Sequence, residues 1–200
     1  MGVSTNYMAL HKTPSSMLKE SLNESLEAAR LCVYYRKSDE KWGDYATGGC
    51  LGFPSAIILF SIIDTIGSYF RKDKQFTVNI DNKKYSIHGE GWEHFKILNS
   101  KYFRQSLSLD FIKTLYQKFR NSVTHNSVLG QNAIMFLDEI RAEPISYQSK
   151  AFATTIDEKG DKIYLVSITE LYKMCEYAVM EFNKDIDIVV PNSRQGSKFH

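Results

Sequence analysis

The sequence predicts a mainly α-helical fold, an antiparallel helical bundle with small β-hairpin insertions. Three segments, at 15–36, 54–70 and 108–130, place apolar residues at helical spacing. Two others, at 75–87 and 146–168, alternate apolar and polar residues around turn-forming Asp, Asn and Gly. Of the 200 residues, 43% are hydrophobic and 24% are charged, so a single globular domain with a sizeable core is expected.

Composition gives little support for a protein that coats nucleic acid. The formal net charge is +2 and the pI is near 8.3, so any RNA contact must rest on a local basic cluster. Cys32, Cys50 and Cys175 are odd in number, widely spaced and without a Cys-x-x-Cys pair. This spacing disfavours a disulfide framework or a thiolate zinc site, and we expect a reducing, cytoplasmic setting. Residues 1–14 lack the pattern of a secretory signal.

The first helix is predicted from Ser15 or Ser16, either of which can cap it, to about Arg36. Its apolar residues recur at i, i+4, i+8, i+11 and i+15: Leu18, Leu22, Leu26, Ala29 and Val33. A polar, glycine-containing connection over 37–52 follows. Its glycines lack the spacing and the following Lys-Ser or Lys-Thr of a phosphate-binding loop.

The second helix, from Pro54 to Phe70, is apolar on nearly every face and should therefore be central. Asp64 interrupts the apolar run, which disfavours a membrane span. A carboxylate on a buried helix must pair with a donor or lie at a rim. One interpretation is that Asp64 faces the 108–130 helix and orients Arg120 or His125; the other is a structural hydrogen bond elsewhere.

The segment 75–87 is predicted to be a small hairpin that turns at Asp81-Asn82-Lys83. The stretch 88–94 gathers two His and two Glu, but its glycines make it a loop and the His-Glu-x-x-His spacing of a zinc helix is absent. We therefore expect no metal. A short helix should follow over 92–98.

The C-terminal third is predicted to hold a strand or packed arm over 133–140 and a hairpin over 146–168. A last helix should run from a cap at Thr169 to about Lys184. We expect one domain over 1–200, with flexible ends at 1–14 and 191–200.

The helix expected over 108–130 carries the most chemically informative residues. Its apolar row is Phe111, Leu115, Phe119 and Val123. Its last turns carry Arg120, Asn121 and His125. At 3.6 residues per turn, Asn121 and His125 share a face, whereas Arg120 and His125 lie about 140° apart. If the helix loosens near Thr124, the guanidinium and the imidazole could meet on one anion.

That pair suits phosphate ester chemistry. An imidazole titrates near neutral pH and exchanges protons with hydroxyl and leaving oxygens, while a guanidinium binds phosphate oxygens through its planar fork. The structural alternative is a solvated Arg together with a His that favours the helix C-terminal dipole.

The run 115–126, LYQKFRNSVTHN, resembles the signature of the HEPN superfamily, in which an Arg is followed after four to six residues by a His near a helix end. The apolar segment 52–64, GFPSAIILFSIID, resembles the second helix of such proteins. The resemblance covers about residues 15–130. It implies a helical bundle that dimerises with its motif helices side by side.

The resemblance also implies an activity, namely endoribonuclease cleavage without metal or other cofactor. His125 would be the acid or base, Arg120 would stabilise the phosphate, and Asn121 would position one of them. Lys118, Arg104 and Lys101 are candidate RNA contacts. Such proteins serve in toxin–antitoxin and phage-defence systems, so an antitoxin is a possible partner. The alternative is a non-catalytic module that binds a nucleotide or RNA, or that dimerises.

Overall fold

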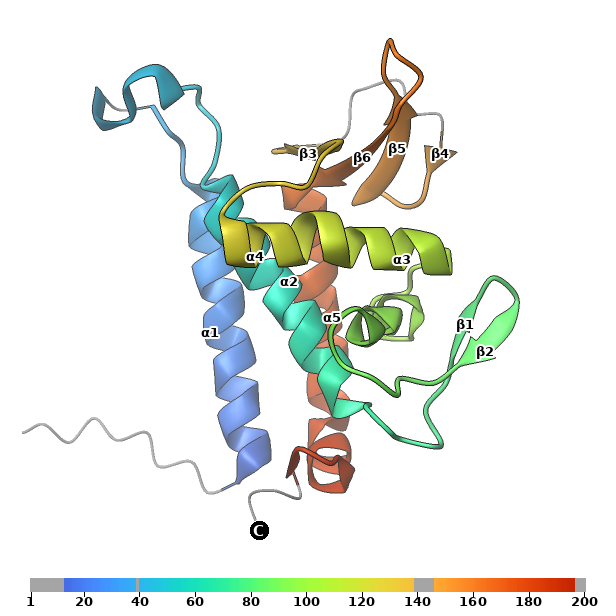
Figure 1. Cartoon of the computed structure of the whole chain (residues 1–200). Helices are drawn as coiled ribbons and strands as arrows, with labels where there is room; N and C mark the ends of the chain where they lie inside the picture. Colours follow the sequence, from blue (N-terminus) through green and yellow to red (C-terminus); the bar gives the residue numbers. More distant parts are fainter. Residues whose placement is uncertain (1–12, 39, 139–145, 197–200) are drawn as a thin grey trace, which may run out of the picture.

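The computed structural model describes residues 13–38, 40–138 and 146–196, and it is mainly helical (Figure 1). Three long helices run side by side: α1 (Pro14–Tyr34), α2 (Gly52–Tyr69) and α5 (Ile168–Asn192). The core lies between them. Its fully buried side chains include Val33, Leu59, Phe60, Ile63 and Phe182. The predicted helical fold class is therefore confirmed.

The helix α1 begins slightly earlier than the sequence suggested. Its cap is Thr13, whose hydroxyl accepts a hydrogen bond from the Ser16 backbone N–H, while the Ser16 hydroxyl accepts one from the Thr13 N–H. This reciprocal arrangement satisfies two helix-terminal donors. Ser16 thus completes the cap rather than forming it. Between α1 and α2 lies a short helical segment, η1 (Glu40–Tyr45).

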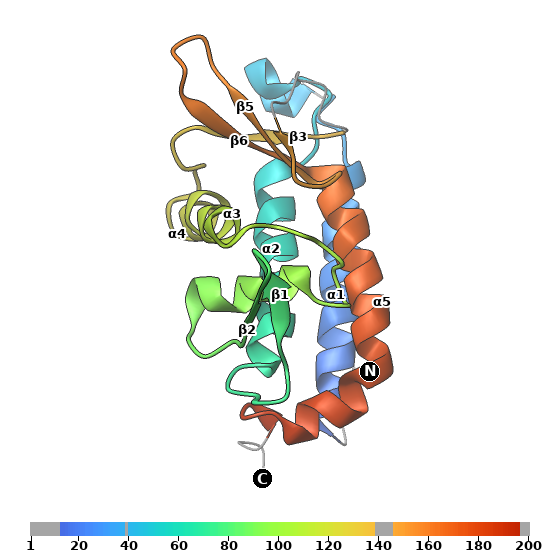
Figure 2. The same cartoon turned by 90° about the vertical axis from the view of Figure 1, so that its right-hand side faces the viewer.

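The motif segment forms one rod that crosses α2 (Figures 1 and 2). It consists of α3 (Leu109–Leu115), a π-helical turn η3 (Tyr116–Asn121) and α4 (Ser122–Asn126). The Ser108 hydroxyl caps it by accepting from the Phe111 N–H. The predicted apolar row is buried along the whole rod. The helix does loosen, but at 116–121 rather than near Thr124.

The predicted 75–87 hairpin is present as β1 (Val78–Ile80) and β2 (Lys83–Tyr85), paired antiparallel. Its turn residues Asp81 and Asn82 both adopt the left-handed conformation, which Asp and Asn tolerate. The short helix expected over 92–98 is the 3₁₀ segment η2 (Gly91–Asn99).

A four-stranded sheet caps one end of the bundle, with the strand order β3-β6-β5-β4. Its strands are β3 (Ala133–Phe136), β4 (Ser146–Tyr147), β5 (Phe152–Ile156) and β6 (Lys162–Ser167). The hairpin between β5 and β6 was predicted. The parallel pairing of β3 with β6 was not, because it joins segments that lie about thirty residues apart along the chain.

The last helix, α5, is longer than predicted at both ends. Ser167 caps it, accepting from the Glu170 N–H, whereas the Thr169 hydroxyl donates to the Leu137 carbonyl. The helix continues past Lys184 through Pro191 to Asn192, and Ser193 is buried, so 191–196 belongs to the folded bundle. Residues 1–12 and 197–200, where we expected flexible ends, lie outside the described residues.

Within the described residues, α2 alone is long and apolar enough to cross a membrane, with 44% of it buried inside the fold. The core helix of a soluble protein meets the same criteria, so this is weak support for a span.

Candidate functional site

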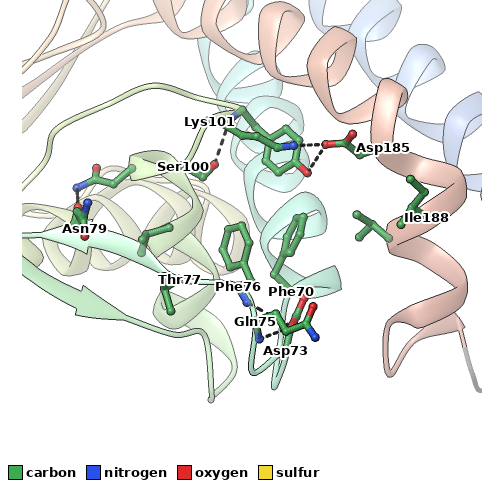
Figure 3. Close-up of a pocket in the computed structure, with 14 residues that line it drawn as sticks. Phe70, Asp73, Gln75, Phe76, Thr77, Asn79, Ser100, Lys101, Asp185 and Ile188 are labelled. Carbon is green, nitrogen blue, oxygen red and sulfur yellow. Dashed lines mark hydrogen bonds and ion pairs between the residues drawn. The ribbon is translucent and has the colours of Figure 1, made fainter.

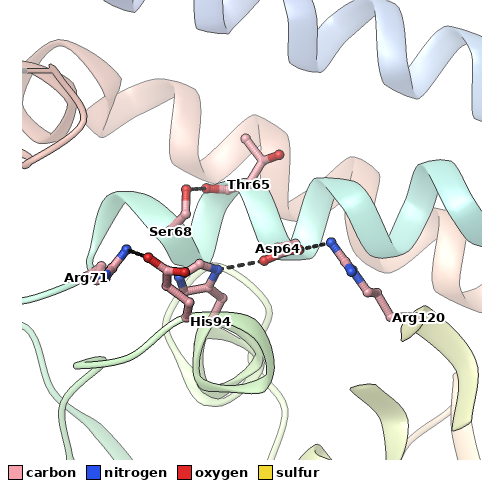
Figure 4. Close-up of polar contacts among 7 residues, drawn as sticks. Asp64, Thr65, Ser68, Arg71, His94 and Arg120 are labelled. Atoms are coloured by element: carbon pink, nitrogen blue, oxygen red, sulfur yellow. Dashed lines mark hydrogen bonds and ion pairs between the residues drawn. The ribbon is translucent and has the colours of Figure 1, made fainter. Parts of the chain in front are cut away.

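The carboxylate of Asp64 lies between the side chains of Arg120 and His94 (Figure 4). Its Oδ2 accepts from Nη2 of Arg120 at 2.7 Å, and its Oδ1 lies 2.6 Å from Nδ1 of His94. The three side chains are only 10–22% exposed. The contact with Arg120 is the one that the sequence suggested. The second contact is with His94 rather than His125.

Three elements bring these residues together, since Asp64 is on α2, His94 on η2 and Arg120 on η3. The close approach of η2 to α2 depends on Gly67, where a Cβ would lie 2.2 Å from the His94 carbonyl oxygen. The π turn widens the rod at 116–121, which changes the direction of side chains relative to an unbroken α-helix.

His94 is the site residue that sequence reasoning missed. The sequence places it in the stretch 88–94, for which the residue pattern suggests only a metal loop. A carboxylate accepts hydrogen bonds, so Nδ1 donates to Asp64. The other ring nitrogen, Nε2, is buried and has no hydrogen-bond partner in the described structure. The sequence signal for His94 is weak, because η2 also contains the polar residues Glu93, Lys96 and Asn99.

Arg120 is held on two sides. Besides its ion pair with Asp64, its guanidinium carbon lies 5.4 Å from the centroid of the Tyr116 ring, one helical turn away. Its Nε is buried without a hydrogen-bond partner among the described residues. Arg120 is therefore a fixed cation rather than a solvated surface side chain.

The other two motif residues, Asn121 and His125, are exposed on the same rod. The His125 side chain has no hydrogen bond or ion pair with residues 13–38, 40–138 or 146–196. The helix α4 ends directly after it, with Ser127 in the left-handed conformation. Within one chain, the structure thus brings Arg120 to Asp64 but does not bring Arg120 and His125 to a common partner.

Lys118, a predicted RNA contact, is half-buried and serves the fold. Its ammonium donates to the Gln131 carbonyl and lies 5.6 Å from the Tyr164 ring centroid. Its own carbonyl accepts from the Gly130 N–H. These contacts fix the chain between α4 and β3.

Lys101 and Arg104, the other predicted RNA contacts, have their partners on α5, whereas those of Arg120 lie on α2 and η3. Lys101 pairs with Asp185 on the wall of a cavity of about 580 Å³ (Figure 3). That hydrogen bond lowers the pKa of Asp185. The Arg104 guanidinium lies 4.6 Å from the Tyr177 ring centroid. The structure does not join these two cations to the Asp64 site.

The described residues contain no group of three or more His, Cys, Asp or Glu side chains placed to hold a metal ion.

Comparison with known proteins gave no match to any family model, curated protein or solved structure.

Proposed function

We propose that this protein is a metal-independent endoribonuclease of the HEPN type that acts as a homodimer. The observation that carries the proposal is the ion pair between Asp64 and Arg120. It fixes the Arg of the Arg-x-x-x-x-His motif against the helix that resembles the second helix of HEPN proteins. Residues 52–64 and 115–126, which carry the resemblance, thus contribute to a single polar site.

In the proposed reaction, the RNA 2′-hydroxyl attacks the neighbouring phosphorus. The P–O bond to the following nucleotide breaks, leaving a 2′,3′-cyclic phosphate and a 5′-hydroxyl. His125 either accepts the proton of the 2′-hydroxyl as a base or donates a proton to the leaving 5′-oxygen as an acid, and water exchanges the other proton. The Arg120 nitrogens not engaged by Asp64 stabilise the charge that gathers on the phosphate, and Asn121 positions His125 from the same face of the rod.

A dimer is part of the proposal because one chain directs Arg120 inward and His125 outward. Two rods packed side by side would place the Arg120 and His125 side chains of both chains along one cleft. Exposed apolar side chains on α1, α2 and the segment after α4 support such an interface: Leu31, Phe53 and Val128. Toxin or phage-defence roles, with an antitoxin as partner, extend the same proposal.

The test is cleavage of mixed single-stranded RNAs in the presence of EDTA. We expect the wild-type protein to cleave, and His125→Ala and Arg120→Ala each to lose about 100-fold or more in rate. Arg120→Lys keeps the positive charge but removes the planar guanidinium, so it tests whether that planar group is needed. His88→Ala, which alters an exposed His on another loop, is the matched control. Full activity in both His125→Ala and Arg120→Ala would refute the mechanism.

The second candidate function is a non-catalytic module that binds RNA or a nucleotide. It is favoured by the pairing of Arg120 with Asp64, which already neutralises much of its charge, and by the separation of Arg120 from His125 in one chain. This alternative predicts RNA binding without cleavage products, measured by gel shift beside the cleavage assay.

A further inference from the structure

A second cavity, of about 670 Å³, lies on the α5 side of the molecule. Three separate parts of the chain line it: the link between η2 and α3, the loop between β4 and β5, and the first turns of α5. Figure 2 shows that link running alongside α5. The volume is within the range of about 300–1,000 Å³ that is typical of small-molecule sites.

The charge of this cavity is positive. Arg104, Lys150 and Lys173 line it together with one carboxylate, Glu170, which pairs with Lys173 at 2.6 Å. The side chains of Arg104 and Lys150 have neither a hydrogen bond nor an ion pair with any other residue that the structure describes. Two cations of the cavity thus remain available to an anion.

Arg104 is also held in place. Its guanidinium lies over the Tyr177 ring, and its backbone is left-handed with φ of +54°. A non-glycine residue in this conformation carries strain, and such residues occur preferentially at functional sites. A guanidinium stacked on a ring keeps its N–H groups directed outward from its edge, where they suit a phosphate.

Tyr177 supplies a separate indication of a ligand. Its hydroxyl is buried and has no hydrogen-bond partner among the described residues. Buried hydroxyls normally have a partner, so an acceptor from outside the chain would remove an unfavourable state. Phe103, Ala151 and Met174 give the same cavity an apolar wall.

We propose that this cavity binds a small phosphorylated molecule about the size of a nucleoside monophosphate. Arg104 and Lys150 bind the phosphate oxygens, the Tyr177 hydroxyl donates to the ligand, and the apolar wall receives its organic part. The proposal is independent of the ribonuclease proposal, because the residues that line this cavity include none of Asp64, His94, Arg120 or His125.

The test is calorimetric titration of the full chain with adenosine monophosphate, with inorganic phosphate and with adenosine. We expect adenosine monophosphate to bind more tightly than either other compound. Arg104→Gln and Lys150→Gln should each weaken that binding about tenfold. Tyr177→Phe, which keeps the ring beneath Arg104, should weaken it severalfold.

Two controls locate the binding. Lys159→Gln, at the exposed turn between β5 and β6, and His125→Gln, on the motif rod, should both bind like wild type. The proposal is overturned if adenosine monophosphate does not bind, if Lys150→Gln binds it like wild type, or if His125→Gln is the variant that loses binding. It is also overturned if Arg104 and Lys150 affect only the binding of a single-stranded RNA.

Discussion

Asp64 contacts two other polar side chains at once. Its carboxylate accepts from Arg120 and from His94, and all three side chains are largely shielded from water. If an amide replaced this carboxylate, the Arg120 guanidinium and the His94 imidazole N–H would compete for the single amide oxygen. Leaving such a group buried without a partner costs more stability than the paired groups contribute.

The substitution Asp64→Asn tests this dependence at nearly constant volume. We expect it to lower the free energy of unfolding by about 2 kcal/mol, because the amide offers one acceptor oxygen and places N–H groups against a donor. Thermal unfolding followed by circular dichroism measures the change. Asp187→Asn, at an exposed position on α5, is the matched control, and an equal loss in both variants would contradict the role given to Asp64.

Among single residues, the sequence suggested the contact of Asp64 with Arg120 and missed its contact with His94. Asp64 stood out because a carboxylate in an apolar helix has few stable solutions, and a nearby Arg is one of them. His94 gave no comparable signal, since its pairing depends on how closely η2 approaches α2. The π turn at 116–121 was equally hidden, because no sequence pattern specified it.

The contact between α2 and η2 depends on a residue without a side chain. A Cβ at Gly67 would lie 2.2 Å from the His94 carbonyl oxygen, so the two elements could not keep their present separation. This approach is what allows His94 to reach Asp64, three residues earlier on α2.

The substitution Gly67→Ala is therefore expected to lower the free energy of unfolding by about 3 kcal/mol, despite the better helix propensity of Ala. Urea unfolding provides the measurement. Ser61→Ala, at an exposed position on the same helix, should change stability by no more than about 0.5 kcal/mol. A Gly67→Ala protein as stable as wild type would show that the spacing is not needed.

Local patterns predicted the elements, whereas long-range pairing remained hidden. The helices at 14–34, 52–69 and 109–126 follow directly from apolar periodicity. The parallel pairing of β3 with β6 depends on where the bundle places the two strands. The starts of α1 and α5 lie two or three residues earlier than predicted, because Thr13 and Ser167 form the capping hydrogen bonds, and α5 also continues beyond Lys184 to Asn192.

For the whole molecule, carboxylates with lowered pKa values set the response to acid. Burial works to raise the pKa of Glu93, but N–H donors from His88 and Gly89, together with the Lys96 ammonium, hold it below its usual value. The Lys101 ammonium does the same for Asp185. A lowered folded-state pKa adds stability above the unfolded value, and this stability is lost as the pH falls through the folded value.

We therefore expect the free energy of unfolding to fall as the pH drops below about 4.5, the ordinary Glu value. Glu93→Gln should be less stable than wild type at pH 7 and should approach it at pH 3. Denaturant unfolding between pH 3 and pH 7 measures this. The free energy of unfolding of Glu158→Gln, at an exposed turn, should change with pH as it does in wild type. The same pH dependence in Glu93→Gln as in wild type would contradict the role given to Glu93.

The central claim is that Arg120, held by Asp64, and His125 act on the same phosphate. The most direct measurement is the single-turnover rate of RNA cleavage, with EDTA present, for Arg120→Ala, His125→Ala and the double variant. Groups that act as one unit are not additive, so we predict that the double variant is about as slow as the slower single variant. Wild-type rates in both single variants, or losses that multiply in the double variant, would contradict the claim.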